Sequence, residues 1–209
     1  MTDTFGDMVN EIVDETRRSM STTIESLIQD AIANYETERF WFNLTNDTTF
    51  SLSASQATYT SADNSMIPRF MDIDRLEVTI STNYTPYMEK KSYNWIRDYN
   101  DTNALSQPCY WTYWGEAIHT NLPDGGYTVR LSGLTRLASL SVSSDTNAWV
   151  QRGSGKELIK QRAKSLLYSE YLRDDANAGR AAGREQQALQ KLNLRTAKLL
   201  ATGTIEPSL

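Results

Sequence analysis

The 209-residue sequence predicts a mainly helical α+β protein, in which a helical body carries a small antiparallel β insertion. Three observations lead to this fold class. Apolar residues recur at helical spacing at both ends of the chain, the spacing changes to strict alternation in the middle, and turn-forming residues separate the alternating segments. We expect two N-terminal helices in residues 1–39, the β unit in 40–142, two long C-terminal helices in 143–202 and a tail in 203–209.

The N-terminal part of the body shows two amphipathic segments. Thr22 and Glu25 have the spacing of a capping box, which predicts that the second helix begins near Thr22. Because the segments are close together in the sequence, we expect them to form an antiparallel pair. Their apolar stripes consist of Phe5, Met8, Val9, Ile12 and Val13 in the first segment, and of Ile24, Leu27, Ile28, Ala31 and Ile32 in the second.

The alternating pattern begins directly after the second helix. Apolar residues at every second position in 40–44 and 50–52 flank the turn-forming pair Asn46–Asp47, which predicts a β-hairpin. The polar segment 53–65 predicts a loop that could include a short strand near Tyr59. Alternation in 76–80 predicts a further strand.

Residues 82–103 are rich in aromatic side chains and fit two structures. The stretch from Glu89 to Tyr99 could be a short helix or a strand with a loop, and Pro86 argues against a central strand. The aromatic residues could form a contact surface for a partner, because Tyr and Trp bury much area at a low entropic cost. We favour the alternative, that they cover a thin β core.

A second hairpin is predicted in residues 110–131. Tyr110–Ile118 has the composition of a strand, Pro123–Gly126 is a strong turn signal, and Tyr127–Leu131 alternates as a returning strand. These three segments follow each other directly, so we expect the two strands to pair.

The C-terminal part of the chain predicts two long helices. Ser154 and Glu157 form a second potential capping box ahead of an amphipathic segment that reaches Tyr171. Asp174–Asp175 can end this helix and cap the next, which should run from about residue 176 to 201, where Gly203 stops it.

The last helix sorts its charges onto one face. At helical spacing its cations share one side, and an apolar stripe occupies the other. Residues 1–150 contain 10 basic and 20 acidic side chains, whereas residues 151–209 contain 11 basic and 6 acidic ones. An acidic body with a basic arm can pair with copies of itself or with an acidic partner, although a solvated helix face would look the same. The cations are Arg180, Arg184, Lys191, Arg195 and Lys198.

Composition restricts where the protein works. The single cysteine, Cys109, excludes a disulfide framework within the chain and favours a reducing cytoplasm. Met1–Asp14 lacks the features of a signal peptide, and no segment approaches the ~18 apolar residues of a membrane span. We therefore expect assembly in the cytoplasm and no membrane partner.

Few residues could perform catalysis. His119 is the only histidine, and no motif supplies it with an orienting acid and a nucleophile. Cys109 has no CxxC partner and is interpreted as a buried small side chain. Two carboxylates that meet only in the folded chain would escape a sequence search.

Candidate cofactor and metal motifs also fail. Gly153–Lys156 is superficially similar to a phosphate loop, but Val150 stands where the motif needs Gly and Glu157 where it needs Ser or Thr. The acidic pairs Asp72/Asp74 and Asp174–Asp175 lack further ligand spacing. We expect no catalytic residue, no metal and no cofactor, and hence a protein that is not an enzyme.

Several segments together resemble the head-to-tail adaptor (tail accessory) proteins of tailed bacteriophages, best known from short-tailed phages. The resemblance covers most of the chain and is strongest in residues 127–174. Many family members carry Asp-Asp and Pro where this chain has Ser144–Asp145 and Ala148, which affects a turn only. The segments that carry it are Ala31–Ile32 with Tyr35 and Phe40–Asn43, Tyr127–Leu131 with Leu140 and Ser143–Trp149, Leu158–Ile159 with Ala163, Leu166–Tyr168 and Leu172–Asp174, and Gly203–Pro207.

This resemblance implies a structural protein of the virion neck. It implies a helical body with a β insertion, and a ring of twelve copies that docks beneath the portal protein. The ring would extend the DNA channel, with DNA only as passing cargo, and would receive a downstream tail or nozzle protein.

Two contact surfaces are hypothesised on this basis. The cationic face Arg180–Lys198 and the tail would contact the portal or a neighbouring subunit, since a closed ring needs a head-to-tail interface. An aromatic surface of the β unit would face a neighbour or a later tail protein. The tail residues are Thr204, Ile205, Glu206 and Pro207, and the aromatic residues are Tyr84, Tyr87, Trp95 and Trp111.

Three alternatives stay open. The chain could be another neck or baseplate component of a long-tailed phage. It could bind nucleic acid through its cationic face, although the acidic body should repel DNA. It could also be a virion hydrolase that degrades the cell wall, which would need His119 or two carboxylates in a cleft.

Overall fold

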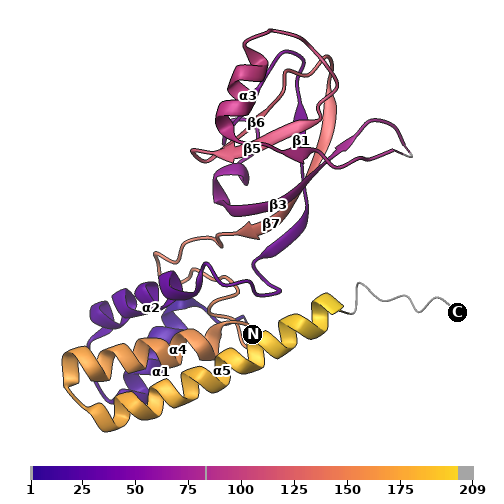
Figure 1. Cartoon of the computed structure of the whole chain (residues 1–209). Helices are drawn as coiled ribbons and strands as arrows, with labels where there is room; N and C mark the ends of the chain where they lie inside the picture. Colours follow the sequence, from indigo (N-terminus) through magenta and orange to yellow (C-terminus); the bar gives the residue numbers. More distant parts are fainter. Residues whose placement is uncertain (1, 83, 202–209) are drawn as a thin grey trace, which may run out of the picture. The chain divides into compact units, whose positions relative to one another are not determined.

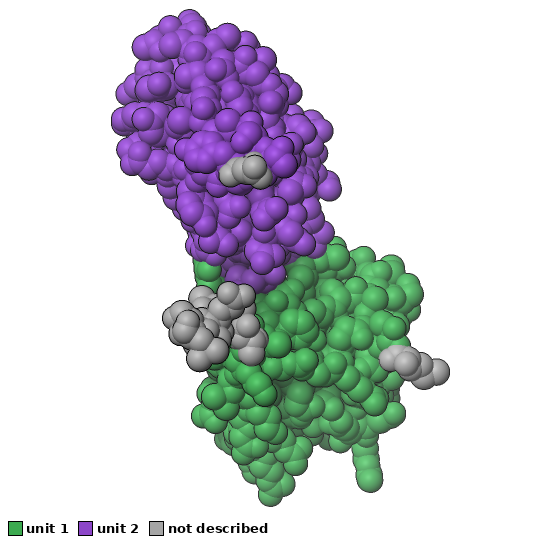
Figure 2. All heavy atoms as spheres, turned by 90° about the vertical axis from the view of Figure 1, so that its right-hand side faces the viewer, with its two compact units in different colours: residues 1–43, 137–209 green, residues 44–136 purple. Residues whose placement is uncertain are grey.

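The chain folds into two compact units. The computed structural model describes residues 2–82 and 84–201. A helical unit comprises residues 1–43 and 137–209, and a β unit comprises residues 44–136 (Figures 1 and 2). Along the sequence, the β unit is thus inserted between the two segments that build the helical unit. Each unit encloses a hydrophobic core of its own.

Four long helical segments build the helical unit. They are α1 (Phe5–Thr16), α2 (Ser21–Tyr35), α4 (Lys156–Leu166), which continues into the π-helical segment η2 (Leu167–Leu172), and α5 (Asp175–Ala201). Helix α4 packs against the other three helices, so the apolar stripes meet around it (Figure 1). The predicted stripes of the first two helices lie in this core, together with Trp149, Val150, Leu158 and Ile159.

The starts of α1, α2 and α4 differ from the sequence analysis in their capping. Helix α1 has a capping box that the sequence analysis missed, in which Thr4 and Asp7 exchange hydrogen bonds. The predicted Thr22 box is wrong, because α2 begins one residue earlier and Met20 provides no side-chain cap. The predicted Ser154 box is also wrong, because Ser154 lies in a turn and Gly155 is the N-cap of α4.

The connection between η2 and α5 forms where the sequence predicts it. Arg173 adopts a left-handed conformation, with φ of 49°, and ends η2. The carboxylate of Asp174 then accepts a hydrogen bond of 3.0 Å from the amide of Asn177. The expected capping role of Asp174 is therefore confirmed.

The hairpin predicted after α2 is wrong. Phe40 and Phe42 belong to the helical unit, where both rings meet Trp149 edge-on at centroid distances of 5.8 and 5.0 Å. Strand β1 (Leu44–Leu52) then runs without a break. The turn-forming pair Asn46–Asp47 falls where the register of β1 shifts, so it accommodates a bulge and does not reverse the chain.

The β unit contains two sheets. In the first, β7 (Tyr127–Thr135) lies between β1 and β3 (Phe70–Thr79), and all three strands are antiparallel. In the second, the order is β2 (Thr58–Tyr59), β6 (Ala117–Thr120), β5 (Tyr110–Trp114) and β4 (Glu89–Lys90), with β4 parallel to β5. Both sheets contribute to one core that includes Tyr59, Leu76, Trp111, Ile118 and Leu131.

The second predicted hairpin is also wrong in its pairing. Strand β5 turns back over Gly115 and Glu116, whose φ values of 59° and 58° suit a two-residue hairpin turn, and it pairs with β6. The Pro123–Gly126 turn instead leads from one sheet to the other, where β7 fills the position between β1 and β3.

The ambiguous aromatic segment contains both predicted elements. Strand β4 is followed by helix α3 (Tyr93–Asn100), whose start is capped by the hydroxyl of Ser92. Helix α3 lies on the second sheet (Figure 1) and buries Ile96. A short 3-10 turn, η1 (Ile67–Arg69), precedes β3.

The predicted fold class is therefore wrong in its proportions. Helices account for 41% of the chain and strands for 23%, in sheets of three and four strands, so the fold is a mixed α+β fold. The helical body with a small β insertion is not what forms, because residues 44–136 build two sheets that together enclose a second hydrophobic core.

Candidate functional site

The cationic face of α5 is solvent-exposed throughout. The other side of helix α5 faces the core of the helical unit. Its buried residues are Ala181, Glu185, Ala188, Leu192 and Thr196. The spacing of these buried residues leaves the cations on the outside, as the sequence predicts. The five exposed cations are Arg180, Arg184, Lys191, Arg195 and Lys198.

Three of these cations line a cleft of about 610 Å³ on the helical unit, which we call the basic cleft. Helix α5 contributes Arg184, Lys191 and Arg195, and the turn before α4 contributes Arg152. The apolar lining comes from Leu158 on α4 and from Ala188 and Leu192 on α5. The cleft thus combines a cationic rim with an apolar floor, which suits an amphipathic anion.

Arg195 is held in place by its surroundings. Its guanidinium donates a hydrogen bond to the carbonyl of Gly153 and lies 4.9 Å from the centre of the Trp41 ring. Thr196 fixes this segment in turn, because its hydroxyl accepts a 3.2 Å hydrogen bond from the amide of Trp41. Arg195 therefore lines the basic cleft in a position that its contacts to Gly153 and Trp41 fix.

Arg184 and Lys191 are different, because nothing in the described part of the chain pairs with them. Neither side chain has a hydrogen bond, ion pair or ring contact within residues 2–82 and 84–201. Both lie on the exposed side of α5 and line the basic cleft. They are therefore available to a ligand or partner that carries negative charge.

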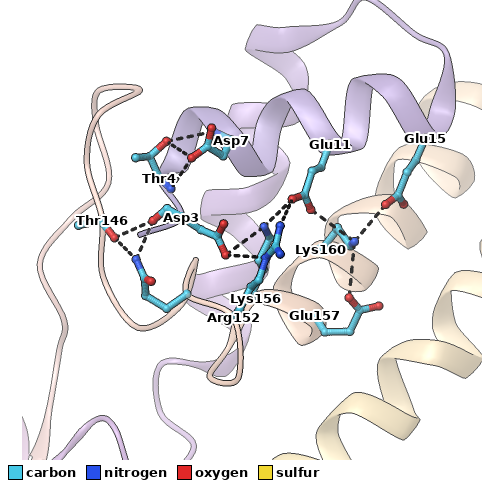
Figure 3. A network of polar contacts seen from close by, with 11 residues as sticks. Asp3, Thr4, Asp7, Glu11, Glu15, Thr146, Arg152, Lys156, Glu157 and Lys160 are labelled. Atoms are coloured by element: carbon cyan, nitrogen blue, oxygen red, sulfur yellow. Dashed lines mark hydrogen bonds and ion pairs between the residues drawn. The ribbon is translucent and has the colours of Figure 1, made fainter. Parts of the chain in front are cut away.

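A row of ion pairs fixes the α4 side of the cleft. Lys156 donates a 2.6 Å hydrogen bond to Glu11 and lies 3.4 Å from Asp3, and Lys160 lies 3.0 Å from Glu15 (Figure 3). The spacing of four residues on both α1 and α4 aligns these carboxylates with these lysines. Lys156 therefore faces α1, and its charge is largely neutralised within the fold.

The ion pairs shift two pKa values. Burial acts to raise the pKa of Glu15, but hydrogen bonds from Lys164 and Lys160 outweigh it and hold this pKa below the usual 4.5. Burial acts to lower the pKa of Lys160, but its hydrogen bond to Glu15 and the nearby carboxylate charges raise this pKa above the usual 10.5. Both shifts favour the charged pair.

A second polar contact ties α5 to the core. The hydroxyl of Tyr35 donates a hydrogen bond to the buried carboxylate of Glu185, and Arg162 lies 3.8 Å from the same carboxylate. Burial and the hydrogen bond to Glu185 raise the pKa of Tyr35 well above its usual value. This contact fixes the rotation of α5 and hence the direction of its cationic face.

The aromatic residues proposed as a surface separate into two groups. Tyr84, Tyr87 and Trp95 are exposed, with 57%, 65% and 37% of their surface accessible, whereas Trp111 is 1% exposed. Trp111 donates its indole N–H to the carbonyl of Met88 in the core of the β unit, so it cannot reach a partner in this structure.

The structure adds aromatic residues that the sequence analysis did not select. Trp114 is 63% exposed and stacks on Tyr93. Trp95 contacts Tyr99 and Tyr110 at centroid distances of 5.0 and 4.7 Å. The missing signal was the orientation of β5, because aromatic residues occupy both of its faces and alternation alone gives no preference.

The other predicted residues belong to neither the cationic face nor the aromatic surface. Thr204, Ile205, Glu206 and Pro207 lie outside the described residues. Cys109 is exposed, which contradicts its interpretation as a buried side chain. Gly155 lies before Lys156 for a packing reason, since a Cβ there would lie 2.6 Å from the ring of Trp149.

His119 has a structural environment. Its ring nitrogens lie 3.1 Å from the hydroxyl of Thr58 and 3.3 Å from the carbonyl of Trp114, and burial lowers its pKa. Among the described residues, no group of three or more His, Cys, Asp or Glu side chains could hold a metal ion. Over the same ranges, none of the helices has the length and apolar character needed to cross a membrane.

The comparison with known proteins gives one positive result. The model of the family described as SU10 adaptor protein matches residues 3–206, which is nearly the whole chain. No curated protein matches the chain significantly. The family match agrees with the resemblance to phage adaptors and covers both units and the α5 surface. The chain therefore belongs to the SU10 adaptor protein family and is a structural, adaptor-type protein of a bacteriophage virion.

Proposed function

We propose that this protein is a head-to-tail adaptor that forms a ring of twelve copies below the portal. In this role it extends the DNA channel, lets DNA pass as cargo and provides the attachment site for a downstream tail or nozzle protein. The role is structural and not enzymatic, and its place is the virion neck. Family membership supports the adaptor class, and the ring, its position and its partners are the proposal.

The single observation that carries the proposal is the pair of unpaired cations on α5. A ring of identical subunits needs two different surfaces that fit each other, and an adaptor needs a further surface for each neighbour in the virion. Arg184 and Lys191 project from a fold that pairs most of its interior charge, and they lie beside an apolar floor. Such a combination is typical of a protein contact.

The exposed aromatic residues of the β unit support a separate contact. The guanidinium of Arg75 lies 5.5 Å from the centre of the Tyr87 ring, and the ammonium of Lys91 lies 5.3 Å from the centre of the Trp95 ring. Tyrosine, tryptophan and arginine side chains are enriched where proteins bind one another. We assign this surface to the downstream tail protein.

The experiment is a binding assay of the full chain with the portal ring of the same phage. The triple variant Arg184→Glu, Lys191→Glu and Arg195→Glu reverses the charge of the basic cleft and should abolish assembly on the portal. The double variant Arg17→Glu and Arg18→Glu, which reverses two exposed cations elsewhere on the helical unit, should assemble as the wild type does. Unchanged portal binding by the triple variant would refute a role of the basic cleft in assembly on the portal.

A further inference from the structure

The helical unit carries an unpaired acidic corner as well as the basic cleft. The corner lies where η2 meets α5 and consists of Glu170, Tyr171 and Asp175. All three are exposed, and 52% of the surface of Tyr171 is accessible. Within the described ranges, the carboxylates of Glu170 and Asp175 have no ion pair or side-chain hydrogen bond, whereas Asp174 is occupied with capping α5.

The corner arises from the way the chain reverses. The left-handed conformation of Arg173 ends η2, and Leu172 packs against the core, which leaves Tyr171 on the outside. Tyr171 presents a largely apolar ring next to two carboxylates that have no ion-pair partner among the described residues, so the corner offers aromatic surface and negative charge together. This arrangement matches the side chains that would fill an apolar cleft with a cationic rim.

We propose that the acidic corner of one copy docks in the basic cleft of the next copy. The ring of Tyr171 would enter the cleft above Leu158, Ala188 and Leu192, which line its base and expose at most 7% of their surface. Its flanking carboxylates would pair with Arg184 and Lys191, the two cleft cations without partners. This inference rests on the proposed ring, for which it identifies the contact between subunits.

The geometry of α5 requires that the two features come from different copies. Asp175 and Lys191 belong to one continuous helix, and a rise of 1.5 Å per residue separates them by about 24 Å. The corner therefore cannot reach the cleft of its own chain. A contact between two different surfaces is head-to-tail, so repetition of the contact leads to a closed ring or a filament.

The cleft fits a protein segment better than a nucleic-acid backbone. A phosphate backbone is recognised by a continuous series of cations and needs no apolar floor. Here the cleft is short, it contains the carboxylate of Glu157, and its floor is formed by aliphatic side chains. We therefore assign the cleft to a second copy, and DNA binding becomes an outcome that the test can reveal.

The test places a photoreactive p-benzoylphenylalanine at position 171 of the full chain, which keeps an aromatic ring there. Labelled and unlabelled chains are mixed, irradiated alone and on the portal ring, and the cross-linked peptides are identified by mass spectrometry. The expected cross-links join position 171 of one copy to residues 152–158 or 184–195 of another. Arg184→Glu with Lys191→Glu should reduce their yield at least tenfold, and Arg17→Glu with Arg18→Glu should not.

A charge exchange strengthens the test. The unlabelled chain carries Arg184→Glu with Lys191→Glu, and the photoreactive chain carries Glu170→Lys with Asp175→Lys. This combination should recover much of the cross-link yield that the cleft variant alone loses. The proposed contact is overturned if the cross-links are absent, or join other residues, both in solution and on the portal. If the portal complex still forms in that case, the proposed adaptor function stands and only the contact is wrong. The contact is also overturned if the cleft cations retain duplex DNA and no cross-link forms. Cross-links between copies that never bind the portal would uphold the contact and contradict the proposed function.

Discussion

Replacing Lys156 with Met removes one charge from the ion-pair row between α1 and α4, and its effect can be worked out from the structure. Lys156 and Arg152 contact the same two carboxylates, Asp3 and Glu11. The side chain of Lys156 is 7% exposed and that of Arg152 is 78% exposed. The two residues thus form a matched pair that differs mainly in burial.

The expected size follows from how many partners remain. Breaking a fully buried ion pair costs about 3–5 kcal/mol, because an unpaired charge stays behind. Here the carboxylates of Asp3 and Glu11 are 13% and 32% exposed and keep contacts to Arg152 or Lys160. We therefore expect Lys156→Met to lower the free energy of unfolding by about 1–2 kcal/mol, and Arg152→Met by less than about 0.5 kcal/mol.

The assay is urea unfolding followed by far-ultraviolet circular dichroism, whose signal comes mostly from the helical unit. This choice matters because the two units can unfold separately, and a single transition cannot be assumed. Equal destabilisation by Lys156→Met and Arg152→Met would refute the reasoning, because it would mean that burial does not decide the strength of these ion pairs.

Three further results are expected from urea unfolding, followed by circular dichroism for the helical unit and by tryptophan fluorescence for the Gly133 variant, since Trp95, Trp111 and Trp114 lie in the β unit. The pKa of Glu15 is lowered, so the contribution of Glu15 to stability should be lost as the pH falls below 4.5. The pKa of Lys160 is raised, so the contribution of Lys160 should be lost as the pH rises above 10.5. The difference in unfolding free energy between wild type and Glu15→Gln should therefore shrink at acidic pH, and a constant difference would contradict this. Gly133→Ala should destabilise the β unit by more than about 2 kcal/mol, since its Cβ would lie 2.2 Å from the carbonyl of Asp72. Gly179→Ala meets nothing within 4 Å and should stabilise α5 by up to about 1 kcal/mol; a loss of stability would show that this position is constrained.

The helices could be predicted because their signals are local. Apolar residues three or four apart define α1, α2, α4 and α5 without reference to the rest of the chain. The capping role of Asp174 was predictable for the same reason. Two predicted capping boxes failed because a Thr-x-x-Glu or Ser-x-x-Glu pattern does not say on which residue a helix begins.

Strand pairing could not be predicted because it depends on distant residues. The alternating pattern of β7 is compatible with pairing to β5 across the Pro123–Gly126 turn or to more distant strands. Only the folded chain shows that β7 pairs with β1 and β3. The short Gly115–Glu116 turn closes the β5–β6 hairpin, and its sequence lacks the usual Asn-Gly signal.

The candidate site was predictable in part. Helical spacing placed Arg184, Lys191 and Arg195 on one exposed face, and the structure agrees. The cleft itself needs the turn at Arg152 and the α4 residue Leu158, which are distant in sequence. The amphipathic pattern that ends at Tyr171 predicts an inward-facing side chain there, whereas Tyr171 lies in the π-helical segment η2 and is 52% exposed.

The most direct test of the adaptor role is the native mass of the portal ring before and after the full chain is added. We expect a discrete increase that corresponds to a complete ring of twelve copies, with no complex formed by the triple charge-reversal variant of the basic cleft. An unchanged mass, or an increase that grows continuously with added protein, would contradict a closed adaptor ring on the portal.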